Sequence, residues 1–87
     1  MERGPRIEIF WRDAQDHHET WVNEEDAEKF SEADCIVSSM GYLYKKTSKF
    51  LTLGGDWDEE DKNYGTLRKI PIGMIQRIDY LETTKAT

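Results

Sequence analysis

The sequence predicts a small α+β domain that is mainly β, with five strands in a strongly bent barrel and one short helix. Short apolar runs recur along the chain and are separated by turn signals. Gly41 interrupts the longest run, and glycine inside a strand often marks a bulge or a bend. Pro71 ends the fourth run, because proline has no N–H group to donate to a ladder.

The first strand is expected at residues 6–11, where Ile7, Ile9 and Trp11 occupy alternate positions. Alternate positions of a strand face the same side of a sheet, so these three side chains are expected to share one face. The polar residues 13–20 follow as a loop.

A short helix is predicted at residues 23–33. Asn23 is a favourable N-cap, and the three acidic residues after it complement the helix dipole. Phe30 is expected to hold the helix against the domain. Trp21 and Val22 precede the helix either as a short strand or as a packing anchor.

The second half of the chain supplies the other four strands. They are expected at residues 35–46, 49–53 and 64–70, with the last one near the C-terminus. Gly54 and Gly55 are expected to end the third strand. Residues 72–81 combine a three-residue repeat of isoleucine with Gly73, which disfavours a helix. We therefore expect one tight turn at residues 71–74 and then a strand.

The predicted core consists of the apolar residues of these elements. Its members are Ile9, Trp11, Phe30, Ile36 or Val37, Leu43, Leu51, Leu53, Leu67, Ile75, Ile78 and Leu81.

Length and composition predict one domain over residues 1–87, with flexible ends at residues 1–5 and 83–87. The net charge of −6 counts against nucleic acid as a partner, because a nucleic-acid binder normally presents a basic face. The only cysteine, Cys35, excludes an internal disulfide and is expected to be a buried small side chain. Without an apolar leader or span, we expect a cytoplasmic protein with no membrane contact.

Two stretches resemble the layout of SH3-like and Sm-like barrels. The segment GYLYKKTSKFLTL is similar to their first hairpin, and LRKIPIGMIQRI is similar to their closing unit. The Sm-like resemblance implies an RNA or single-stranded nucleic-acid binding module. Tyr42, Tyr44, Phe50 and Tyr64, beside nearby lysines, would form its stacking platform.

A second resemblance covers most of the chain. Trp11 and Asp13, then IVSSMGYLYKK, then IPIGMIQRIDYL resemble, in this order, small proteins encoded by bacteriophages. The resemblance implies a phage product in the cytoplasm of a bacterial host, acting on a host or defence protein.

The candidate partner-binding residues are Trp57, Asp58, Glu59, Glu60, Asp61, Tyr42 and Tyr44. Trp57 is an aromatic anchor among carboxylates, in a segment (residues 54–63) that we expect to be an exposed connection. The acids do not fit a calcium-binding EF-hand, because Asp61 stands where that loop needs glycine.

No catalytic, cofactor or metal site is expected. The polar residues Asp13, Asp16, His17, His18 and Glu19 have no second cluster to complete a metal site. The leading interpretation is a non-catalytic protein-binding accessory factor. The alternatives are the Sm-like nucleic-acid module and an acidic mimic of nucleic acid. Homo-oligomers could form through open edge strands, expected at residues 6–11 and 75–81.

Overall fold

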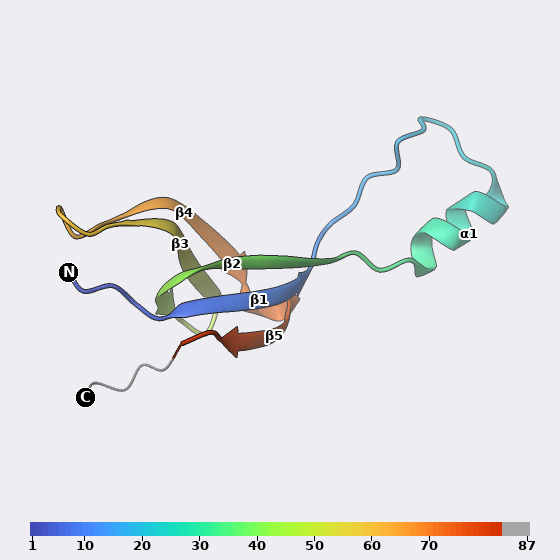
Figure 1. Cartoon of the computed structure of the whole chain (residues 1–87). Helices are drawn as coiled ribbons and strands as arrows, with labels where there is room; N and C mark the ends of the chain where they lie inside the picture. The colour runs from blue at the N-terminus through green and yellow to red at the C-terminus, as the bar shows by residue number, and fades with distance from the viewer. Residues whose placement is uncertain (83–87) are drawn as a thin grey trace.

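The computed structural model of the chain describes residues 1–82 and shows a mainly β fold with one helix (Figure 1). In chain order the elements are β1 (Arg6–Arg12), α1 (Glu24–Glu32), β2 (Ile36–Lys46), β3 (Phe50–Asp58), β4 (Asn63–Pro71), the 3-10 turn η1 (Ile72–Met74) and β5 (Ile75–Tyr80). The predicted α+β, mainly β class is confirmed. The flexible end expected at residues 83–87 lies outside the described residues.

All five strands form one antiparallel sheet in the order β4-β3-β2-β1-β5. Strand β1 is paired on both sides, since Ile9 lies opposite Ser39 of β2 and Ile78 of β5. The prediction of an open edge at residues 6–11 is therefore wrong, whereas β5 does lie at an edge. The turn predicted before β5 is confirmed as η1.

The core is formed by side chains of β1, β3 and β4. Ile7, Ile9, Leu51, Leu53 and Ile70 are buried, and the half-buried side chains packed against them are Trp11, Leu43, Ile72, Ile75 and Ile78. The alternation predicted for the first strand holds, because the neighbours of Ile7 and Ile9 are all less buried than they are. The core predicted from the sequence omitted Ile7 and Ile70.

Several predicted core residues are exposed instead. Leu67 is 61% exposed, and Leu81 also lies at the surface. Of the two alternatives at the start of β2, Ile36 is exposed and Val37 is half-buried. In β4 the buried residue is Ile70, three positions from Leu67, so alternation places Leu67 on the opposite face of the strand. Leu81 lies beyond the end of β5, and Ile36 is the first residue of β2.

The two glycines expected to end the third strand lie within it. Strand β3 continues to Asp58, and its pairing with β4 extends to Asn63. Gly54 is required by a neighbour rather than by a turn, because a Cβ at this position would lie 2.4 Å from Cδ1 of Tyr64. The exposed connection predicted at residues 54–63 is therefore only the short turn between these two strands.

The bend expected at Gly41 also has a different origin. The register of β2 against β3 shifts between Leu43 and Lys45, beyond the glycine. A Cβ at Gly41 would lie 2.7 Å from the backbone carbonyl oxygen of Gly54, so Gly41 allows the two strands to approach closely.

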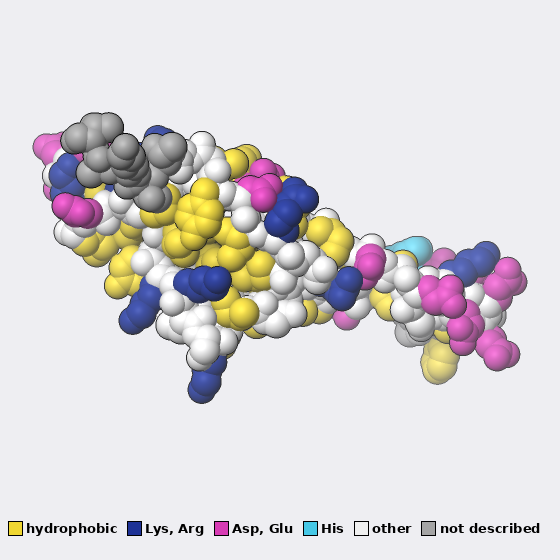
Figure 2. Space-filling view, turned by 90° about the horizontal axis from the view of Figure 1, so that it is seen from below, with side chains coloured by type: hydrophobic (Ala, Val, Ile, Leu, Met, Phe, Trp, Pro, Cys, Tyr) yellow, Lys and Arg dark blue, Asp and Glu magenta, His cyan; other side chains and the backbone are white. Residues whose placement is uncertain are grey.

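Between β1 and β2 the chain forms an arm, residues 13–35, that extends away from the sheet and carries α1 at its far end (Figure 1). The backbone N–H of Asp13 donates to the carbonyl oxygen of Cys35 at 3.0 Å, which closes the base of the arm. The molecule measures 58 × 23 × 21 Å. Asp and Glu side chains gather over the arm in Figure 2.

The predicted helix is confirmed, but its predicted contact is wrong. The side chain of Asn23 accepts a hydrogen bond from the backbone N–H of Asp26 at 2.8 Å, as an N-cap should. Phe30 does not reach the sheet, and its ring packs edge-on against His17 within the arm. Trp21 forms neither a strand nor an anchor, since 88% of its surface is exposed.

Candidate functional site

Three aromatic rings meet at the hairpin of β3 and β4. Trp57 and Tyr64 lie directly opposite each other in the register, and their ring centroids are 4.9 Å apart. Tyr44 of β2 packs edge-on against Tyr64 at 5.5 Å between ring centroids. We call Tyr44, Trp57, Tyr64 and the neighbouring Leu67 the hairpin cluster.

Tyr64 is fixed at the centre of this cluster by the N-terminal segment. The backbone N–H of Gly4 donates to its hydroxyl group at 2.6 Å. Beside that contact, the backbone N–H of Leu43 donates to the carbonyl oxygen of Pro5 at 2.9 Å. The ring also lies over Gly54, where no side chain stands in its way. These contacts hold Tyr64 in place, so the side chains that pack on its ring also have a defined position.

The hairpin cluster presents apolar surface to solvent. Tyr44 is 52% exposed, and Leu67 beside it is more exposed still. A shallow pocket of about 320 Å³ lies here, lined by Met1, Tyr44, Asn63, Tyr64 and Leu67. A group of exposed apolar side chains around a pocket is typical of a contact surface.

Carboxylates surround the tip of the same hairpin, residues 58–61, which we call the acidic tip. The side chain of Asp58 accepts hydrogen bonds from the backbone N–H groups of Glu60 and Asp61, at 3.0 and 3.1 Å. Glu59 accepts from Nζ of Lys62 at 2.6 Å and from the indole of Trp57 at 3.0 Å. These two bonds, the lysine first, lower the pKa of Glu59 below its ordinary value.

The structure thus divides the predicted partner-binding residues. Trp57, Tyr44 and the acidic tip belong to one end of the sheet. Tyr42 does not join them; instead, the guanidinium groups of Arg3 and Arg6 lie over its ring at 5.0 and 5.5 Å. Sequence reasoning placed Leu67 in the core and missed it as a surface residue. The alternation counted back from Ile70 was the available signal.

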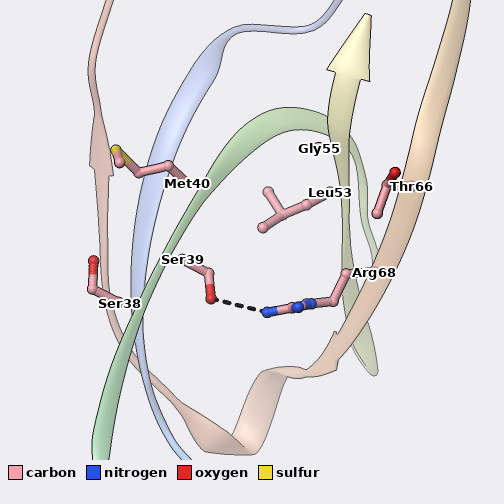
Figure 3. Close-up of a pocket in the computed structure, with 7 residues that line it drawn as sticks. All are labelled: Ser38, Ser39, Met40, Leu53, Gly55, Thr66 and Arg68. Atoms are coloured by element: carbon pink, nitrogen blue, oxygen red, sulfur yellow. Dashed lines mark hydrogen bonds between the residues drawn. The ribbon is translucent and has the colours of Figure 1, made fainter.

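A second hollow lies between β2 and β4 (Figure 3). It measures about 270 Å³ and is lined by Ser38, Ser39, Met40, Leu53, Gly55, Thr66 and Arg68. The hydroxyl of Ser39 accepts hydrogen bonds from Nη1 of Arg68 at 3.3 Å and from the indole of Trp11 at 3.0 Å. Within residues 1–82, Arg68 forms no ion pair with a carboxylate.

Thr66 lines this hollow with an unusual backbone conformation. Its φ of +54° is unusual for a β-branched residue, and its hydroxyl donates to Asp56 at 3.1 Å. Guanidinium and hydroxyl groups together are suited to an acidic group of a ligand. The hollow and the hairpin cluster both include residues of β4.

The polar loop of the arm holds no assembled metal site. The rings of His17 and His18 stack at 4.7 Å, and Nδ1 of His17 accepts from the backbone N–H of Glu19. In the part of the chain that the structure describes, no three His, Cys, Asp or Glu side chains are grouped to hold a metal ion. Cys35 is half-buried at the base of the arm, less buried than expected.

No helix among residues 1–82 is both long enough and apolar enough to cross a membrane. Comparisons of the chain with protein-family models, with curated proteins and with solved structures give no match. We therefore infer function from the chemistry of the surfaces themselves.

Proposed function

We propose that this chain is a non-catalytic, protein-binding accessory factor and that its partner docks on the hairpin cluster. The observation that carries the proposal is the exposed apolar surface of Tyr44 and Leu67 beside the acidic tip. Aromatic side chains in a defined position lose little conformational entropy when they are covered, and they dominate many binding interfaces. The matching partner surface carries an apolar projection and basic residues.

The acidic tip and the hairpin cluster have separate tasks in this proposal. Exposed charges mainly steer the encounter, whereas buried aromatic contacts slow dissociation. Replacing the acids at residues 58–61 with amides should therefore lower the association rate. Trp57→Ala should instead raise the dissociation rate, because Trp57 supports the ring of Tyr64.

The proposed setting is a bacterial cytoplasm, with a host or defence protein as the target of a phage-encoded factor. The three motifs that resemble phage proteins support this setting. The sheet order β4-β3-β2-β1-β5, with η1 between β4 and β5, supports an SH3-like or Sm-like barrel. Such barrels often serve as scaffolds for contact surfaces.

The test is an affinity pull-down from bacterial lysate, with and without nuclease. We expect the parent chain to retain a protein after nuclease treatment and Trp57→Ala to lose it. Met40→Ala is the matched control, because Met40 is 67% exposed and lies outside the hairpin cluster. Circular dichroism confirms that the variants fold. Recovery of nucleic acid alone, or equal capture by Trp57→Ala, contradicts the proposal.

A second candidate is a single-stranded nucleic-acid binder. It is favoured by Nζ of Lys69, which lies 4.6 Å from the centre of the Phe50 ring, and by Lys49, which directly precedes that phenylalanine. Aromatic rings beside lysines are typical of stacking platforms. Binding of a labelled oligonucleotide should then fall steeply as salt is raised, and Lys69→Gln should weaken it.

A further inference from the structure

The arm has no packing partner within the described part of the molecule. Helix α1 contains nine residues and none of them is buried. Trp21, just before the helix, is 88% exposed. Isolated helices shorter than about 12 residues are marginal in water, and most helical stability comes from packing of an apolar face. An exposed tryptophan beside a short helix without buried residues would gain stability from a surface that covers both.

Charge identifies the kind of surface that fits. Residues 13–35 contain nine of the 18 acidic residues and one of the 12 basic residues, so the arm carries −8 while the rest of the chain carries +2. Figure 2 shows the acidic side chains gathered over the arm, and hydrophobic side chains with Lys and Arg over the sheet. The surface that covers the arm must therefore be apolar with a basic margin.

The sheet of this same chain has such a surface. A pocket of about 260 Å³ lies at the junction of η1 and β5, lined by Lys46, Ile72, Ile75, Gln76, Arg77 and Ile78. Three isoleucines supply the apolar part, and Lys46 and Arg77 supply the charge. Arg77 is held there by two contacts. Its guanidinium lies 4.1 Å from the centre of the Phe10 ring, and its Nε pairs with the carboxylate of Asp79 at 3.1 Å. We call this the isoleucine pocket.

We propose that two copies of the chain exchange arms. In the dimer, Trp21 of each copy enters the isoleucine pocket of the other copy, and the carboxylates that flank it face Lys46 and Arg77. The base of the arm continues the ladder of β1 and β2, so the arm extends away from its own sheet (Figure 1). Reciprocal exchange uses the same two surfaces twice and closes with two-fold symmetry.

This dimer is separate from the proposed partner surface. The arm lies at one end of the molecule, and the hairpin of β3 and β4, which carries Trp57 and Tyr64, extends toward the other end (Figure 1). Each dimer would therefore present two free hairpin clusters. A target with two sites, or a target at high density, would be held by both.

The first test is the mass of the purified chain by light scattering across concentration. We expect twice 10.2 kDa at high concentration and a shift to 10.2 kDa on dilution. Trp21→Ala should raise the dissociation constant of the dimer at least about 30-fold, the effect of losing a hot-spot tryptophan. Met40→Ala is the exposed control outside both surfaces and should leave the constant unchanged.

The second test reverses the charges. Lys46→Glu with Arg77→Glu should weaken the dimer, and adding Glu24→Lys with Glu25→Lys in the same chain should restore it. Restoration requires that the two sets of residues face each other, so a general loss of folding could not produce it. A monomeric mass at every concentration overturns the proposal. A dimer that is indifferent to Trp21→Ala, or one not restored by the second charge pair, overturns it as well.

Discussion

Because Gly54 has no side chain, there is room for the ring at the centre of the candidate site. The ring of Tyr64 occupies the space where a Cβ of residue 54 would be, and Trp57 and Tyr44 pack on that ring. We predict that Gly54→Ala lowers the free energy of unfolding by about 1–3 kcal/mol, because an extra methyl group in a filled space forces its neighbours to move. Urea denaturation measures the change.

Gly73→Ala is the matched control for that prediction. A Cβ at Gly73 would have no atom within 4 Å, so the same methyl group meets open space. Its unfolding free energy should stay the same or rise by up to about 1 kcal/mol, because alanine restricts the unfolded chain. Equal losses for the two variants would show that the ring of Tyr64 is not what makes Gly54 necessary.

Glu82 makes stability depend on pH. Its carboxylate accepts a hydrogen bond from the backbone N–H of Arg6 at 3.0 Å and pairs with the side chains of Arg3 and Arg6. The backbone bond is the main cause that lowers the pKa of Glu82. A carboxylate whose pKa is lower in the folded chain than in the unfolded chain stabilises the fold at pH values above its unfolded pKa, about 4.3. This stabilisation is lost as the pH falls through the pKa of the folded state.

We therefore predict that Glu82→Gln flattens the acid side of the stability curve. The parent chain should lose stability as pH falls below about 4.3, and the variant should lose less over the same range. Urea denaturation at a series of pH values from neutral to acid measures the two slopes. Parallel curves would mean that the contact between Glu82 and Arg6 does not persist in solution.

At the scale of elements, α1 depends on its own cap. Asn23 accepts from the N–H of Asp26, and no residue of the helix is buried against the sheet. We predict that Asn23→Ala lowers the helical signal in circular dichroism, since losing such a cap costs the helix about 1 kcal/mol. The melting temperature of the sheet in monomeric, dilute protein should not change. Asn23→Asp retains the cap and is the control.

Elements with local signals were predictable from the sequence, and long-range contacts were not. Asn23 marks the start of α1, and Pro71 with Gly73 marks the turn before β5, because both effects act on neighbouring residues. Gly54 misled the prediction of β3, since its reason is a ring from another strand. Phe30 misled the prediction of the core, because periodicity identifies a face of the helix but not what covers it.

In the candidate site, too, local features were predictable from the sequence and long-range contacts were not. Trp57 among its carboxylates is visible in the sequence, and these residues do form one end of the sheet. That Tyr44 joins them while Tyr42 does not is decided by the register shift after Leu43. A one-residue change of register moves every later side chain of the strand to the opposite face of the sheet. No local sequence pattern indicates such a change.

For the whole molecule, the arm is separable from the sheet. Its two ends are joined by the hydrogen bond between Asp13 and Cys35, at the end of a regular antiparallel pair. We predict that replacing residues 14–34 with Asn-Gly, a two-residue hairpin turn, leaves the sheet folded and makes it about 2 kcal/mol more stable. The gain reflects the lower entropic cost of closing a shorter loop.

Thermal unfolding and the mass of this shortened chain are the measurements. It should retain the strand signal, unfold cooperatively and remain a monomer at concentrations where the parent is a dimer. A chain that no longer folds would show that the arm contributes to the core. That result would contradict the absence of buried residues in α1.

The base of the arm affects how the sequence of the arm can vary during evolution. Because both ends of residues 13–35 leave from one hydrogen-bonded strand pair, substitutions, insertions and deletions in this segment need not disturb the five core residues. The sequence of the arm can then evolve at a different rate from the sequence of the sheet. The same property makes the position suitable for grafting, since a foreign peptide inserted there would be displayed at the end of a hydrogen-bonded strand pair, away from the five core residues.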